Sequence, residues 1–281
     1  MIPNLLSIAG LDPSGGAGVA ADLKTFAALR CNGMAIITAL TAQNTQGVRA
    51  VHVPPADFVA AQIDAIFEDI EVAAVKIGML ASPHIVEALA DRLAHYKPFF
   101  IVLDPVLEAS SGGALITDDI CEAIAKTLFP LVTLVTPNIA EAARLSGQAV
   151  ADDLEGMRRA ARALHGRGAK AVLVKGGHIG GPTSDDLLFE QESFRLFSAS
   201  RMETRNTHGT GCTLSSAIAA YLGRGYSLKE AISAAKTYLN GALAAAGALS
   251  AGKGAGPLNH FYDFWAGEDD PVRVSKPRHL V

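Results

Sequence analysis

The chain has 281 residues, with 24 Lys and Arg against 28 Asp and Glu, so its formal net charge is −4 and no basic stripe marks a nucleic-acid partner. Hydrophobic residues make up 49% of the sequence, which is enough for a large core and excludes a chain that is mostly disordered. The apolar runs, such as residues 99–103, are far shorter than the roughly 18 residues of a membrane span, and the N-terminus lacks the basic start of a signal peptide. We therefore expect a cytoplasmic protein with neither a membrane nor a nucleic acid as partner.

Short β-branched runs alternate with segments of helical periodicity along the chain. We expect strands over residues 5–9, 35–40, 74–78, 99–103, 131–135 and 171–174. We expect helices over residues 16–30, 59–70, 83–96 and 152–165 between them. A hairpin is expected around residues 187–198, followed by helices over 211–222 and 227–248.

This alternation predicts right-handed βαβ units and hence a mostly parallel central sheet. The strands are continuously apolar, which is typical of a sheet covered by helices on both faces. No linker, repeat or break in composition appears, so we expect an α/β chain with one domain over residues 1–265. Residues 266–281 are expected to form a poorly ordered tail.

A glycine-rich segment, residues 10–18, follows the first expected strand. Its end matches the dinucleotide pattern G-x-G-x-x-A, but that pattern also requires an acidic residue after the second strand. Residues 41–44 read Thr-Ala-Gln-Asn and supply none. Two interpretations stay open: a tight turn between strand and helix, or a glycine loop that binds a small ligand at the carboxyl end of a strand.

Residues 206–212, Asn-Thr-His-Gly-Thr-Gly-Cys, come directly before an expected helix and form the strongest motif. Gly209, Thr210 and Gly211 let the backbone approach an anion, and the amides of the first helical turn point toward it. Cys212 at this position is expected to have its pKa lowered from about 8.5 by the helix N-terminus. The alternative is a glycine-rich helix cap with a small buried cysteine.

Polar side chains stand at the ends of three further expected strands. Asp104 closes one, Asn138 and Glu141 follow the next, and Lys175 ends a third. Asp104 and Glu141 are candidate Mg²⁺ ligands because Mg²⁺ prefers oxygen ligands, and Lys175 could neutralise phosphates. Asn138 and Glu141 also have capping-box spacing, so a purely structural role is open for that pair.

Seven segments, in this order, resemble the ribokinase-like superfamily, and within it the bacterial hydroxymethylpyrimidine/phosphomethylpyrimidine kinases. They are residues 8–18, 21–26, 37–45, 76–80, 136–138, 175–178 and 206–212. The resemblance extends from residue 5 to about residue 265. It implies a ribokinase-like three-layer α/β/α fold, ATP-dependent phosphorylation of a primary alcohol with Mg²⁺, and a homodimer.

Carried over by position, the resemblance also assigns roles to individual residues. Cys212 becomes the candidate base, where most of the superfamily has Asp, and Gly209, Thr210 and Gly211 complete the anion hole. The implied pyrimidine-binding residues are Gln43, Gly10, Met79 and Val106. The implied ATP-binding residues are Lys175 and Asn138, and the implied metal ligands are Asp104 and Glu141.

The leading hypothesis is a kinase that phosphorylates 4-amino-5-hydroxymethyl-2-methylpyrimidine and then its monophosphate, in thiamine diphosphate biosynthesis. A pyridoxal or pyridoxine kinase of the same fold is one alternative, and a non-catalytic pyrimidine-binding sensor is another. Glu108 is the one departure from the expected pattern, and we expect it to face solvent. Cys31 and Cys121 are expected in the core.

Overall fold

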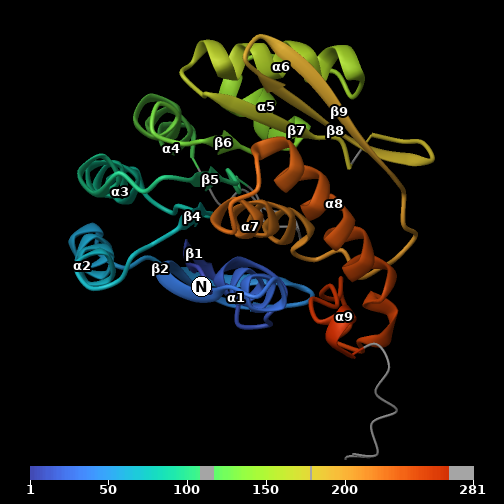
Figure 1. Cartoon of the computed structure of the whole chain (residues 1–281), viewed down its shortest axis with the longest axis horizontal. Helices are drawn as coiled ribbons and strands as arrows, with labels where there is room; N and C mark the ends of the chain where they lie inside the picture. The colour runs from blue at the N-terminus through green and yellow to red at the C-terminus, as the bar shows by residue number, and fades with distance from the viewer. Residues whose placement is uncertain (108–116, 178, 266–281) are drawn as a thin grey trace, which may run out of the picture.

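A computed structural model describes residues 1–107, 117–177 and 179–265 of the chain (Figure 1). The expectations for Glu108 and for the tail, residues 266–281, lie outside the described residues. The described residues form one nine-stranded sheet in the order β3-β2-β1-β4-β5-β6-β7-β8-β9. Its strands come from residues 4–200, and the described residues after Ser200 contribute helices.

Six neighbouring strands are parallel, as the alternation of elements predicts. They are β2 (Asn32–Asn44), β1 (Asn4–Leu11), β4 (Ala74–Ile77), β5 (Ile101–Leu103), β6 (Leu134–Val135) and β7 (Ala171–Lys175). The antiparallel strands β3 (Gly47–His52), β8 (Thr183–Glu190) and β9 (Ser193–Ser200) occupy the two edges. The carboxyl ends of the six parallel strands therefore meet at one edge of the sheet.

Helices cover both faces of the sheet, so the three-layer expectation is confirmed (Figure 1). One face carries α2 (Ala56–Phe67), α3 (Pro83–Tyr96), α4 (Asp118–Ala123) with the π-turn Ile124–Leu128, α5 (Ile139–Ser146) and α6 (Leu154–Gly166). The other carries α1 (Gly18–Ala28), α7 (Thr210–Gly223) and α8 (Leu228–Ala244), and the short helix α9 (Tyr262–Trp265) packs on α8. Each face has its own buried apolar cluster, as expected for a sheet buried on both sides.

The structure differs from the expected strands most clearly at β3 and β6. Strand β3 was not expected, because its sequence is half polar and most of its side chains are exposed at the edge of the sheet. The strand expected over residues 131–135 is reduced to Leu134–Val135. Its first residues close the preceding turn instead, since the Leu131 and Val132 amides donate to the Leu128 carbonyl oxygen.

Cys31 and Cys121 are buried, with 6% and 4% of their surface exposed, so their expected core positions are confirmed. Among the described helices, none is both long enough and apolar enough to cross a membrane.

Candidate active site

The turn that enters α7 brings backbone amides to the carboxyl edge of the sheet. Gly209 is the N-cap residue of α7 and has a φ of 84°, a left-handed conformation that favours glycine. A Cβ atom at Gly209 would lie 1.8 Å from the Gly16 carbonyl oxygen. The glycine loop after β1 and the turn before α7 therefore touch only because both positions lack side chains.

Three of the four residues expected in the anion hole keep their amides available. The Thr210 amide and hydroxyl both donate to the Thr207 carbonyl oxygen, at 3.2 Å and 2.6 Å. Within the described residues, no acceptor faces the amides of Gly209, Gly211 or Cys212. Amides at a helix start that lack a protein acceptor form an anion-binding site.

Lys175, Asp104 and Glu141 come together beside this turn, from three different strand ends. The Lys175 Nζ lies 2.6 Å from Asp104 Oδ1 and 3.8 Å from Glu141 Oε2. A Cβ atom at Gly211 would be 3.1 Å from Lys175 Nζ and 3.6 Å from Asp104 Oδ2. Gly211 thus lets the charged cluster approach the first turn of α7.

The protonation states in this cluster follow from burial and mutual charge. Burial alone would raise the pKa of Asp104, but the Lys175 and Lys76 ammonium groups outweigh it and hold that pKa below its usual value. Burial raises the pKa of Glu141 to about 7; Lys175 opposes this rise and the Asp104 charge adds to it. Burial would lower the pKa of Lys175, but the two carboxylates raise it, so the lysine carries its positive charge.

Asn138 and Glu141 form the capping box that their spacing indicates. The Glu141 amide donates to Asn138 Oδ1 at 2.8 Å, and the Asn138 amide donates to Glu141 Oε2 at 2.7 Å. The Lys175 amide also donates to the Pro137 carbonyl oxygen at 2.8 Å. The structural role of this pair is therefore confirmed, and it holds Glu141 beside Lys175.

The expectation for the pKa of Cys212 is wrong. Burial raises the pKa of this thiol to about 11, against the lowering effects of the Lys76 ammonium and the Gly18 amide. Only 9% of Cys212 is exposed, and the loss of hydration disfavours a thiolate more than the helix N-terminus favours it. In this structure Cys212 is a neutral thiol at pH 7.

The residues expected to bind the pyrimidine are brought together in part. A Cβ atom at Gly10 would lie 3.3 Å from Met79 Sδ, so the ends of β1 and β4 meet there. The Gln43 Nε2 lies 3.4 Å from His208 Nε2, which places Gln43 beside the turn before α7. Val106 follows β5 and is partly exposed, two residues after Asp104; its place in the pocket stays a prediction.

A second lysine–aspartate pair below this edge was missed by sequence reasoning. Lys76 Nζ donates to both Asp22 carboxylate oxygens at 2.9 Å, and neither side chain has any exposed surface. The hydroxyls of Ser7 and Ser216 donate to the same carboxylate at 2.6 Å and 2.7 Å. A lysine inside the apolar strand expected over residues 74–78 was the available signal.

A third buried pair holds the loop after Lys175. Lys236 Nζ lies 2.5 Å from Asp186 Oδ2, and Asp186 Oδ1 accepts a hydrogen bond from the Gly176 amide at 3.1 Å. Helix α8 therefore supports the backbone that follows Lys175. Nothing in the local sequence around Lys236 indicated this partner.

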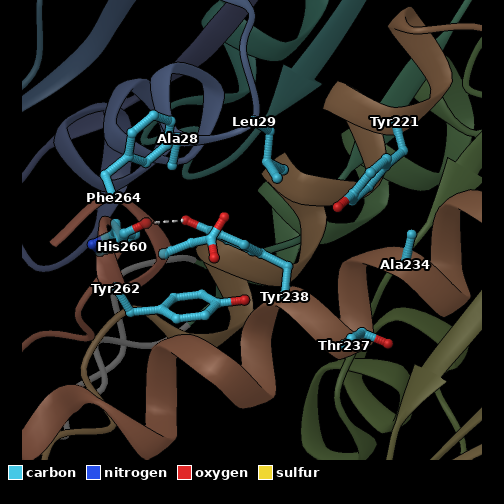
Figure 2. A pocket seen from close by; sticks show the side chains of 10 residues that line it. Ala28, Leu29, Tyr221, Ala234, Thr237, Tyr238, His260, Tyr262 and Phe264 are labelled. Atoms are coloured by element: carbon cyan, nitrogen blue, oxygen red, sulfur yellow. Dashed lines mark hydrogen bonds between the residues drawn. The ribbon is translucent and has the colours of Figure 1, made fainter. Parts of the chain in front are cut away.

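Two cavities lie away from the expected site residues. One, of about 290 Å³, lies between β9 and α8 and includes Lys236. The other, of about 270 Å³, is lined by α1, α7, α8 and α9 (Figure 2). There, Tyr238 Oη donates to the His260 carbonyl oxygen at 2.8 Å, with Tyr221 and Tyr262 nearby. None of the expected site residues lines either cavity.

The residues expected to hold Mg²⁺ are compatible with a small hard cation. Asp104 and Glu141 already enclose one cationic group, the Lys175 ammonium. The described part of the chain contains no group of three or more His, Cys, Asp and Glu side chains suited to a metal. A Mg²⁺ ion held here would therefore take its other ligands from water and phosphate, as is usual for this ion.

The fold and this edge define a class of protein: an α/β protein that binds phosphorylated ligands where parallel strands end beside a helix start. The sequence family described as phosphomethylpyrimidine kinase matches residues 12–259. The hydroxymethylpyrimidine/phosphomethylpyrimidine kinase of Rhizobium meliloti (strain 1021) is 52% identical over 260 residues, which cover 92% of this chain and 97% of the relative. The enzyme of that name from Salmonella typhimurium is 49% identical, with 93% and 98% covered.

Solved structures agree with the sequence relatives. An ADP complex of Bacillus subtilis pyridoxal kinase is 33% identical with a TM-score of 0.84, covering 92% of this chain and 98% of that chain. A phosphomethylpyrimidine kinase from Clostridium difficile 630 is 41% identical with a TM-score of 0.75, covering 85% and 98%. The chain belongs to the phosphomethylpyrimidine kinase family and has the ribokinase-like fold.

Proposed function

We propose that this protein transfers phosphate from ATP to the hydroxymethyl group of 4-amino-5-hydroxymethyl-2-methylpyrimidine, and then adds a second phosphate to the monophosphate. The diphosphate formed would serve thiamine diphosphate biosynthesis. The observation that carries the proposal is the meeting of Lys175, Asp104 and the free amides of the α7 turn at one edge of the sheet. The names of the sequence relatives favour this substrate.

In the first transfer, the substrate hydroxyl oxygen bonds to the γ-phosphorus while the bond from that phosphorus to the β,γ-bridging oxygen breaks and ADP leaves. The amides of Gly209, Gly211 and Cys212 would donate to the oxygens of the moving phosphoryl group. Lys175 would turn from Asp104 toward the phosphates and neutralise their charge. Asn138 would support ATP binding from the adjoining helix start.

Mg²⁺ held by Asp104 and Glu141 would neutralise charge on the ATP phosphates and keep them in line with the hydroxyl. Displacement of the Lys175 ammonium from the two carboxylates would free their oxygens for this ion. The ion pair thus holds both groups in position for their ligands.

Cys212 is the proposed acceptor of the proton that the substrate hydroxyl loses. With a pKa of about 11, only about one molecule in 10⁴ carries the thiolate at pH 7. A loose phosphoryl transfer makes little demand on a base, so most of the rate would come from positioning and from the amides.

The pyrimidine ring would lie between the ends of β1, β2 and β4, against Gly10 and Met79, with Val106 at the side. Gln43 would hydrogen-bond the aminopyrimidine edge. Replacing Gln43 by Ala should raise the substrate KM about tenfold or more, because desolvated hydrogen bonds are lost. An unchanged KM would remove Gln43 from the pocket.

Purified protein with ATP and Mg²⁺ should release ADP when given the pyrimidine alcohol or its monophosphate. The pyridoxal kinases among the structural neighbours make pyridoxal the appropriate competing substrate. Rapid turnover of pyridoxal, with none of either pyrimidine, would replace the proposal by a pyridoxal kinase. Pyrimidine binding without any turnover would instead favour a sensor.

We further propose that residues 1–265 act as a single kinase domain, in a cytoplasmic homodimer. The continuous sheet supports one domain. Exposed apolar side chains beside the β3 edge support self-association: Leu40, Val51, Val53 and Phe58. A chain truncated after residue 265 should keep its activity and melting temperature. Light scattering should give a mass twice that of the chain, and replacing Phe58 by Glu should shift the measured mass toward that of the monomer. Cell fractionation would test the cytoplasmic location.

A further inference from the structure

A four-residue hydrogen-bond cluster links the glycine loop after β1, the end of β2 and the turn before α7. His208 Nε2 lies 2.7 Å from Asp12 Oδ2 and 3.4 Å from Gln43 Nε2. Thr41 Oγ1 lies 3.1 Å from Gln43 Oε1 and 2.9 Å from the Leu11 carbonyl oxygen. Asp12 and His208 are 4% and 7% exposed, so the donors and acceptors in this cluster must match one another.

Asp12 determines which ring nitrogen of His208 carries a proton. Its carboxylate accepts the Ser14 amide and hydroxyl on Oδ1 and the amides of Gly16 and Ala17 on Oδ2. Burial would raise the pKa of Asp12, but hydrogen bonds from His208 and Ser14 lower it to about 2, so the group is an ionised acceptor. His208 Nε2 must therefore be an N–H donor.

Thr41 also constrains the orientation of the Gln43 amide, from the other side. A hydroxyl has one proton, and the Thr41 proton is used when Oγ1 donates to the Leu11 carbonyl oxygen. Toward Gln43, the hydroxyl can then only accept. Protonated His208 Nε2 has no lone pair to accept an amide N–H, although its proton points mainly to Asp12. Both neighbours of the Gln43 amide thus favour the same arrangement, with Oε1 toward His208 Nε2 and Nε2 toward Thr41.

A half-turn of the Gln43 amide about its last side-chain bond gives this arrangement, because the two ends of an amide have the same shape. It replaces an amide N–H that faces the protonated Nε2 of His208 by an amide oxygen, which shares at 3.4 Å the proton that Nε2 donates mainly to Asp12. It leaves one lone pair of Oε1 and one proton of Nε2 free, side by side. That pair matches a ring with an amino group next to an unprotonated ring nitrogen.

We propose that His208 and Thr41 are positioning residues that fix the Gln43 amide in this orientation, and so make the site selective for a 4-aminopyrimidine over its 4-oxo analogue. The 4-oxo ring presents the reverse pattern, an oxygen acceptor beside a ring N–H. An amide free to rotate would accept both rings, whereas a fixed amide rejects the second. The inference rests on the proposed function, since it names how that site would select its substrate.

The test compares kcat/KM for the aminopyrimidine alcohol with kcat/KM for its 4-oxo analogue. The ratio should fall about tenfold or more in Thr41→Val and in His208→Leu, because one polar contact that orients the Gln43 amide is lost in each. The loss should appear in KM more than in kcat, which a general structural defect would not produce. Thr41→Ser retains the accepting hydroxyl and should retain the ratio, and His208→Gln should restore part of it.

An unchanged ratio in Thr41→Val, in protein that melts like the unaltered chain, would overturn the inference and leave the proposed function standing. Failure of the unaltered protein to phosphorylate either pyrimidine would reject the proposed function. The ¹⁵N spectrum of the His208 ring decides independently of turnover. A proton on Nε2 at pH 7.5 is expected, and a proton on Nδ1 alone would overturn the inference whatever the substrate.

Discussion

Two lysine–aspartate ion pairs near Cys212 differ in whether a ligand could displace the lysine from the carboxylate. Lys76 and Asp22 have no exposed surface, and the hydroxyls of Ser7 and Ser216 complete the coordination of the carboxylate. Lys175 is 13% exposed and is shared between Asp104 and Glu141. The first pair has no room for a ligand, whereas the second holds a cation that a ligand can displace. The enclosed pair supports the site, and the open one would do its chemistry.

Lys76→Met should give the largest effect in this comparison, on stability. Removing one partner of a buried pair leaves the Asp22 charge uncompensated, which costs about 3–5 kcal/mol. Urea unfolding measures the loss, and Lys175→Met is the matched comparison, with a smaller loss expected because the Lys76 ammonium still compensates part of the Asp104 charge. If both variants unfold alike, the distinction between the two pairs is wrong.

Lys175→Met should act on catalysis instead. Loss of a charged hydrogen bond to phosphate should lower kcat/KM for ATP about 10- to 100-fold. Steady-state kinetics with ATP varied gives this value, and Lys170→Met, at an exposed position before the same strand, should stay within about twofold. An equal effect at both positions would mean that Lys175 does not meet the phosphates.

Cys212 lies within the electrostatic influence of both pairs, and its burial predicts a pH dependence. The ionised fraction of a thiol with a pKa of about 11 grows about tenfold per unit between pH 7 and pH 9. The kcat should rise with it by less than tenfold per unit, because a loose phosphoryl transfer makes little demand on a base, and Cys212→Ser should give a lower, flat profile, because the hydroxyl does not ionise in this range. A flat profile in the unaltered enzyme would reduce Cys212 to a positioning role.

Glu141 should give the smallest effect, on the apparent affinity for Mg²⁺. Its pKa of about 7 means that the carboxyl is protonated below pH 7 and must lose that proton to bind the ion. The apparent affinity should therefore weaken up to about tenfold per unit as pH falls below 7. Glu141→Gln should remove this slope, measured as Mg²⁺ dependence at several pH values.

Glu230 provides the control for this variant, since it occupies the same capping-box position at the exposed start of α8. Glu230→Gln should leave the slope unchanged. A slope that survives in Glu141→Gln would show that another group titrates with Mg²⁺ binding.

The continuous apolar strands predicted the parallel sheet and its two helical layers, because a strand without polar alternation has no solvated face. The strand ends likewise placed Asp104, Glu141 and Lys175 at one edge. Strand β3 was not predicted, because an exposed edge strand needs no continuous run of apolar side chains. The pKa of Cys212 could not be predicted either. The motif shows that the cysteine lies at a helix start, but not how far the thiol is buried from water.

By itself, then, the sequence determined the layers of the fold, the family and the edge of the sheet where we propose the active site, because periodicity and motif order are properties of the chain alone. Only the tertiary structure decided the protonation of Cys212 and Glu141, the pairing of Lys76 with Asp22, and the link from Asp12 through His208 to Gln43. These depend on burial and on partners up to 196 residues apart in sequence, which come into contact only when the sheet and its helices have assembled.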